Sequence, residues 1–259
     1  MTIENLVKIY QSYLYNLALR LVYYPQDAND LTQDVWVKIF ENIDNFNQKS
    51  DFKTWAYRIM INHFLNQKRK YTQLNFDDFE NTMDSIQNET LSNSYDDTEK
   101  QLLINEAKVG CMMGMLLCLT QEQRAILIIG DIFEIQSYEA CEIFGITKEN
   151  FRKKLSRARK KLYSFMNSYC GEANQNNSCK CALKTQSLIK NKYIDEKNIF
   201  YNETKKIKDI FQNKSDILDD TMDSIFKELY QNHPFITKKD KQLTTEILNN
   251  PQIKQIFEI

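Results

Sequence analysis

The chain has 259 residues, 42% of them hydrophobic, and a formal net charge of only -1. It is long enough for more than one hydrophobic core. The longest apolar stretch, residues 111–119, is far shorter than the roughly 20 residues that span a bilayer, which excludes a membrane protein. The N-terminal residues lack the basic, apolar and small-residue pattern of a secretion signal, so we expect a cytoplasmic protein.

The composition favours helices over strands. Five glycines, three prolines and few alternating apolar and polar runs give strands little support, whereas segments with a period of 3.6 residues recur along the chain. Six cysteines in a long cytoplasmic chain are expected to be small buried residues or free thiols. We therefore predict an all-α protein in which two small helical domains are joined by an acidic linker and followed by a helical C-terminal extension.

The first informative segment, residues 27–46, follows the helix breaker Pro25 and has a broad apolar face. On its opposite side, Asp30, Gln33 and Asp34 fall at i, i+3 and i+4 and form a compact patch of acidic and amide groups. Acids early in a helix also interact favourably with the helix dipole. This patch has two interpretations at this point, a binding surface and a capping role for Asp30.

The next predicted helix, residues 52–70, contains five basic residues and no acid. One face carries Arg58, Asn62, Asn66 and Arg69, with Trp55 and Tyr57 nearby. Amides, guanidinium groups and aromatic rings in this pattern are typical of surfaces that follow a single strand and receive an unstacked base. The alternative is that the aromatic residues are core, and we expect that for Trp55 and also for His63.

Residues 71–100 reverse the sign of the charge, with eight acids against one lysine. A polar, acidic segment rich in Asn and Ser buries too little apolar surface to offset its ordering entropy. We expect a flexible linker here.

Residues 101–168 predict a helix-turn-helix. Thr120 and Gln123 have the spacing of a capping box, Gly145 supplies the positive φ that ends one helix, and Thr147 caps the next. That last helix has a single apolar stripe and outward cations, the geometry that places a helix in a DNA major groove. The alternative is a solvated cationic helix on a bundle. The polar residues at its start and outer face are Thr147, Asn150, Arg152, Lys153, Lys154 and Arg157.

These segments, in this order, resemble the two domains of bacterial extracytoplasmic-function (ECF) sigma factors of the sigma-70 family. The motifs are "DANDLTQDVW", "FKTWAYRIMINHFLNQKRK", an acidic linker, and "LTQEQRAILIIGDIFEIQSYEACEIFGITKENFRKKLSRARKKL". The resemblance implies sigma region 2 at residues 1–70, a linker at 71–100, sigma region 4 at 101–168, and an additional extension at 169–259.

The resemblance also implies site residues and partners. Asp30, Gln33 and Asp34 match the patch that binds the β′ clamp helices of core RNA polymerase. The residues that match the helix contacting the -10 region are Arg58, Asn62, Asn66, Lys68 and Arg69. The recognition helix matches the reader of the -35 region, in a domain that sits on the β flap. Promoter DNA is the other expected partner and an anti-sigma factor a possible one. No catalytic residue, cofactor or membrane contact is implied.

The extension contains Cys170, Cys179 and Cys181, which together with His233 are weak candidates for a Zn²⁺ or copper site. A docking or autoinhibitory module and a purely structural tail are the other interpretations.

The sequence is therefore consistent with three hypotheses. The leading one is an ECF sigma factor, which is not an enzyme. The second is a free-standing helix-turn-helix regulator with an oligomerisation or sensor domain. The third is a metal- or thiol-responsive interaction protein.

Overall fold

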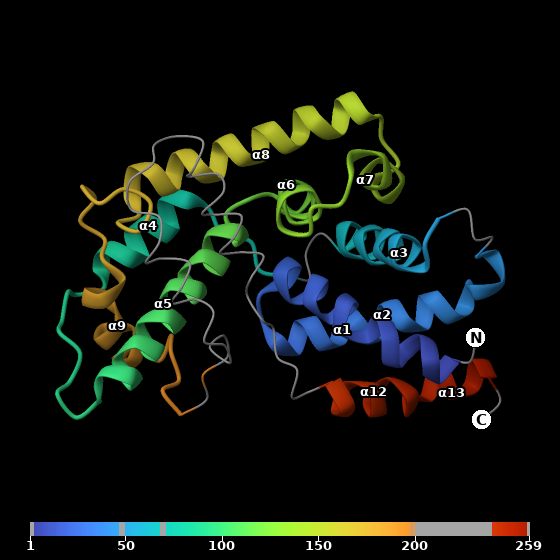
Figure 1. Cartoon of the computed structure of the whole chain (residues 1–259), viewed down its shortest axis with the longest axis horizontal. Helices are drawn as coiled ribbons and strands as arrows, with labels where there is room; N and C mark the ends of the chain where they lie inside the picture. The colour runs from blue at the N-terminus through green and yellow to red at the C-terminus, as the bar shows by residue number, and fades with distance from the viewer. Residues whose placement is uncertain (1–2, 47–49, 68–70, 198, 200–239, 258–259) are drawn as a thin grey trace. The chain divides into compact units, whose positions relative to one another are not determined.

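The computed structural model describes residues 3–46, 50–67, 71–197, 199 and 240–257. The regular structure of these residues is helical (Figure 1). An isolated β-bridge joins Cys170 and Cys179. No helix in these ranges is long and apolar enough to cross a membrane. Residues 200–239 of the extension, which was predicted to be helical, lie outside the described residues.

The described helices fall into two compact units. Unit 1 comprises residues 1–73, 120–156 and 237–259, and unit 2 comprises residues 74–119 and 157–236. The long helix α8 (Lys148–Tyr169) contributes its N-terminal part to unit 1 and its C-terminal part to unit 2.

Unit 1 begins with three helices that pack on one another, α1 (Ile3–Val22), α2 (Pro25–Glu41) and α3 (Phe52–Asn66). Pro25 occupies the first turn of α2, where its missing N–H costs no hydrogen bond. The apolar faces of these helices are buried, as the 3.6-residue period predicts, and Trp36 and Tyr57 are among the largest fully buried side chains.

Against this bundle lie α6 (Gln121–Leu127), the π-helical turn η2 (Ile128–Ile132) and α7 (Ser137–Phe144). The Tyr57 ring of α3 lies 5.7 Å from that of Phe133, and the guanidinium of Arg20 lies over the same Phe133 ring at 5.2 Å. Burial lowers the pKa of Arg20 to about 9.

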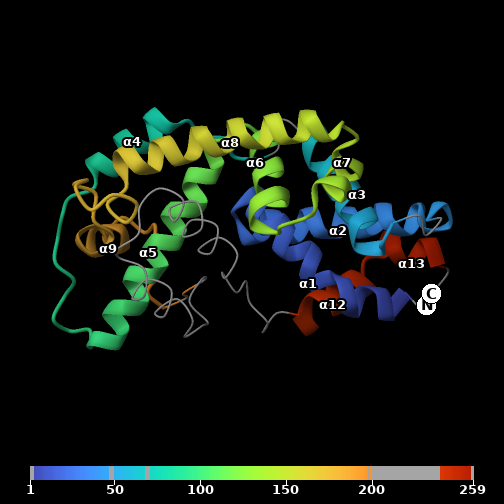
Figure 2. The same cartoon turned by 45° about the horizontal axis from the view of Figure 1, so that its top comes forward.

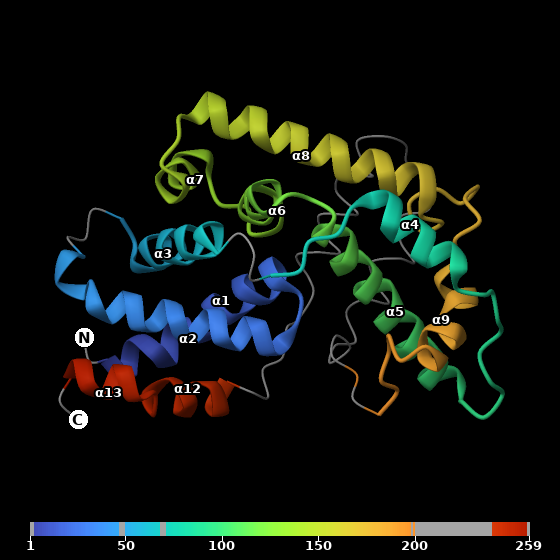
Figure 3. The same cartoon turned by 180° about the vertical axis from the view of Figure 1, so that it is seen from behind.

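Two short C-terminal helices complete unit 1, α12 (Asp240–Leu248) and α13 (Pro251–Phe257). They lie along α1 and α2, and both turned views agree on this placement (Figures 2 and 3). Ile247 and Ile253 are fully buried, and Asn29 Nδ2 of α2 donates to Glu246 Oε2 at 3.2 Å. Helices of this length are marginal alone, so packing on α1 and α2 stabilises them.

Unit 2 is built on α5 (Asp97–Leu117), with α4 (Phe76–Ser85), the C-terminal part of α8, and α9 (Cys181–Lys190). A reciprocal capping box of Asp96 and Glu99 starts α5. The acidic segment is more ordered than its composition predicts, because Met83, Ile86 and Leu91 are buried in one apolar cluster with residues of α5 and α9.

Candidate nucleic-acid and polymerase interface

The acidic patch predicted on α2 lies on one side of that helix. Asp30 is exposed, whereas Gln33 and Asp34 are half-buried. Asp34 Oδ2 lies 3.2 Å from Nε2 of His63 on α3, and the His63 side chain is 12% exposed. His63, expected to be a packing residue, thus also links the patch to the neighbouring helix.

Two further residues, Asp27 and Tyr71, belong to this patch and were not predicted from the sequence. Burial raises the pKa of Tyr71, and the carboxylates of Asp34, Asp27 and Asp30 raise it further. Asp27 precedes Asp30 by three residues, so helical spacing could have found it. Tyr71 gave no such signal, because it follows α3 in sequence and meets α2 only in the fold.

The predicted polar face of α3 is exposed. Arg58, Asn62 and Asn66 are spaced four residues apart and all three face solvent, while Met60 and Phe64 are buried on the other side. Trp55 is half-buried, with its ring 5.2 Å from that of Phe46. Lys68 and Arg69, which were predicted to extend this face, lie outside the described residues.

The helix-turn-helix has the local structure that its sequence predicts. Gly145 ends α7 at φ 62°, a conformation that favours glycine. The hydroxyl of Thr147 accepts a hydrogen bond from the Asn150 amide at 3.2 Å, which caps α8. The Phe144 and Phe151 rings lie 5.8 Å apart across the turn.

The outer face of α8 carries the predicted cations. Its apolar stripe of Phe151, Leu155, Ala158 and Leu162 is buried, as expected. Lys154 is half-buried, and its Nζ donates to Glu122 Oε1 of α6 at 2.6 Å. The other predicted residues of this face are exposed: Thr147, Asn150, Arg152, Lys153 and Arg157.

A buried arginine, which was not predicted from the sequence, connects α6 to the N-terminal bundle. Arg124 has no exposed surface. Its Nη1 donates to the Leu21 carbonyl at 2.5 Å, and its Nη2 lies 3.5 Å from the Thr72 carbonyl and from Gln73 Oε1. A buried guanidinium is costly unless its donors are satisfied, so this group ties α6 to the end of α1 and to the segment that follows α3.

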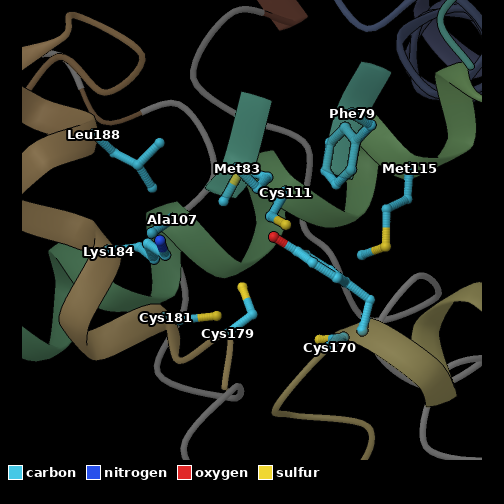
Figure 4. Close-up of a pocket in the computed structure, with 11 residues that line it drawn as sticks. Phe79, Met83, Ala107, Cys111, Met115, Cys170, Cys179, Cys181, Lys184 and Leu188 are labelled. Carbon is cyan, nitrogen blue, oxygen red and sulfur yellow. The ribbon is translucent and has the colours of Figure 1, made fainter. Parts of the chain in front are cut away.

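Four thiols line one small cavity in unit 2. Cys111 comes from α5, Cys170 directly follows α8, Cys179 lies two residues before α9, and Cys181 begins α9; Met83 and Met115 add two thioethers (Figure 4). All six cysteines of the chain are free thiols. Three members of this group were the predicted metal candidates, and Cys111 was not among them.

The cavity is lined mainly by apolar side chains and thiols. Burial raises the pKa of Cys111, Cys170, Cys179 and Cys181. Within the described ranges, no group of three or more His, Cys, Asp or Glu residues is arranged to hold a metal ion. His233 lies outside them. The metal prediction gains no support, and we propose no metal.

Comparison with known proteins identifies the two modules. The model of sigma-70 region 2 matches residues 6–73, which contain α1, α2 and α3. The model of sigma-70 region 4 matches residues 109–162, which contain α6, α7 and most of α8.

Curated relatives agree with these matches. RNA polymerase sigma factor YlaC of Bacillus subtilis is 28% identical over 62% of this chain and 90% of its own length. The ECF sigma factor SigE of Mycolicibacterium smegmatis is 25% identical over 66% of this chain and 64% of its own length. The chain belongs to the ECF sigma-70 family.

As an ECF sigma factor, it carries its candidate surfaces inside the two matched regions. Asp30, Gln33, Asp34 and the polar face of α3 lie in region 2, and the cations of α8 lie in region 4. Residues 163–259 follow both matches.

A solved structure of the sigma factor RpoE with the anti-sigma factor NepR from Bartonella quintana has 21% sequence identity to this chain. The match covers 63% of this chain and 94% of the RpoE chain, with a TM-score of 0.43.

Proposed function

We propose that this ECF sigma factor directs core RNA polymerase to promoters through three surfaces. The α2 patch binds polymerase, the polar face of α3 holds an unpaired promoter strand, and α8 contacts upstream duplex DNA. The observation that carries the proposal is that each surface presents exposed polar groups on a helix whose opposite face is buried. This arrangement holds the binding groups on a rigid support.

The α2 patch suits a cationic protein surface such as the polymerase clamp. Asp27, Asp30 and Asp34 concentrate negative charge on one side of α2, and complementary charge increases association rate and selects the partner. His63 holds Asp34 in place through the 3.2 Å contact, so the carboxylate is preorganised.

The face of α3 suits single-stranded DNA. Asn62 and Asn66 offer both donors and acceptors to the edge of an unpaired base, and Arg58 can bind the phosphate that follows. The sequence-independent part of the interaction then comes from charge, and the amides supply selectivity.

The cations of α8 suit duplex DNA. Arg152, Lys153 and Arg157 are exposed and available to phosphates or base edges. Lys154 is held by Glu122, so it contributes less charge to DNA than its position in the sequence indicates. No step of nucleotide transfer is assigned to this chain, which we propose to be a non-catalytic cytoplasmic subunit.

The test is capture of purified core polymerase by the full-length chain carrying Asp30→Ala and Asp34→Ala. We expect at least a tenfold loss of affinity, since two charges of the proposed contact disappear together. The matched control is Glu41→Ala with Asp44→Ala, which changes the net charge equally at exposed positions of unit 1. Full capture by the first variant, with its helical content and melting temperature preserved, would contradict this assignment of the patch.

A further inference from the structure

Residues of the C-terminal extension form hydrogen bonds and an ion pair with the acidic segment (residues 71–100) within unit 2. The Lys184 ammonium of α9 donates to the Ile86 carbonyl, and the Glu89 amide donates to the Leu183 carbonyl at 2.7 Å. The Glu89 carboxylate also pairs with Lys190 Nζ at 2.7 Å. These bonds join residues separated by more than ninety positions in sequence, so they are tertiary contacts rather than local turns.

Two further hydrogen bonds hold the acidic segment on either side of Ile86 and Glu89. The Ser92 amide donates to Gln186 Oε1 at 2.9 Å, and the Tyr169 hydroxyl donates to Asp84 Oδ1 at 2.5 Å. Beneath these bonds, Ile86 and Leu91 are buried in the same apolar cluster as Leu188 of α9. The segment from 84 to 92 is therefore held by polar and apolar contacts together.

Lys184 is the most informative member of this contact. Its side chain is buried, and an ammonium is costly to bury unless it is hydrogen-bonded. The carbonyl that satisfies it belongs to the acidic segment. Lys190 is exposed by contrast, and the Glu89 pair is worth little alone.

We propose that α9 is a clamp that holds the acidic linker of this sigma factor folded, and that the clamp must open before the linker can engage polymerase. This inference rests on the proposed function. An extended chain spans about 3.3 Å per residue, whereas a helix such as α4 rises only about 1.5 Å per residue, so we expect the linker to reach across polymerase between the two DNA-binding regions only after it has left this folded arrangement. Each contact described above opposes that extension.

The first measurement is hydrogen exchange of the Glu89 and Ser92 amides in the full chain. Lys184→Met keeps most of the apolar length of the side chain but removes the donor to Ile86. We expect exchange to accelerate by about tenfold or more, because a hydrogen bond from a charged group is lost. The matched control is Lys180→Met, since Lys180 Nζ donates to the Gln175 carbonyl within the extension and not to the linker. Unchanged exchange in Lys184→Met would overturn the proposal.

The second measurement is affinity for purified core polymerase. If the closed clamp excludes polymerase, the apparent Kd scales inversely with the open fraction, so affinity should rise by the same factor as exchange. Faster exchange with unchanged or weaker polymerase binding would also overturn the proposal.

A charge exchange provides a second route that does not depend on Lys184. Lys190→Glu should repel Glu89 and increase both exchange and polymerase affinity, and adding Glu89→Lys should restore the values of the native chain. A double variant that behaves like Lys190→Glu would overturn the proposal, because restoring the charge pair would then fail to restore the closed arrangement. Failure of the proposed function is distinguishable, because then neither the native chain nor any variant binds polymerase.

Discussion

Replacing Arg124 with alanine is expected to destabilise unit 1 by about 3 kcal/mol. The guanidinium makes one short hydrogen bond, to Leu21 at 2.5 Å, and two at the outer limit of 3.5 Å. A hydrogen bond from a charged group contributes about 1.5–3 kcal/mol, and loss of the buried side chain adds a cavity. Removing a buried charge also removes its desolvation cost, which offsets part of the lost stability. Alanine nevertheless leaves the Leu21 and Thr72 carbonyls without this donor.

Urea unfolding of the full chain, followed by circular dichroism, would measure this change. Arg124→Met should be less damaging than Arg124→Ala, because methionine fills more of the volume and buries no charge. Arg58→Ala is the control, since Arg58 is exposed on α3 of the same unit. A loss below about 0.5 kcal/mol for Arg124→Ala, the level of an ordinary surface substitution, would refute the reasoning that this residue ties α6 to α1 and α3.

Three further predictions concern the turn, the thiols and the DNA surfaces. Gly145→Ala should cost about 1–2 kcal/mol from backbone strain alone, because no atom lies within 4 Å of the added Cβ, and thermal melting would check this. The four cavity thiols keep their protons in the folded state to higher pH than in the unfolded state, so the unfolding free energy should fall as pH rises above about 9; urea titrations at pH 7 to 10.5 should show it, with a flatter profile in Cys181→Ala. Arg152→Ala should reduce the salt dependence of duplex binding by about one unit of slope, whereas Asn62→Ala should leave duplex binding unchanged and reduce the permanganate reactivity of unpaired thymines in promoter complexes. An unchanged salt slope for Arg152→Ala would contradict a phosphate contact by Arg152. Normal promoter opening by Asn62→Ala would contradict the role of Asn62 in holding the unpaired strand.

The features predictable from sequence are those whose partners are local. Gly145, the Thr147 cap and the apolar stripe from Phe151 to Leu162 depend on spacings of a few residues, and each was confirmed. The capping box of Thr120 and Gln123 was confirmed for the same reason. Helical periodicity likewise predicted the exposed faces of α2, α3 and α8.

The features that could not be predicted depend on distant partners. Arg124 meets Leu21 from 103 positions away, and nothing near Arg124 indicates that it is buried. The acidic segment was predicted to be flexible because its own composition is polar. The prediction could not take account of the apolar surface of α5 and α9, against which Met83, Ile86 and Leu91 are buried. Cys111 seemed an ordinary core residue until the fold brought it to the three thiols of the extension.

The uneven exposure of the cysteines offers a practical route to a fluorescent reporter. Cys141 is half-buried on α7, next to the turn of the helix-turn-helix, whereas Cys118, Cys170, Cys179 and Cys181 are buried. Cys111 is also half-buried, but its raised pKa keeps it in the unreactive thiol form. A maleimide dye added to the native chain should therefore attach first at Cys141. Its anisotropy would then follow the association of region 4 with duplex DNA in real time, without any engineered residue.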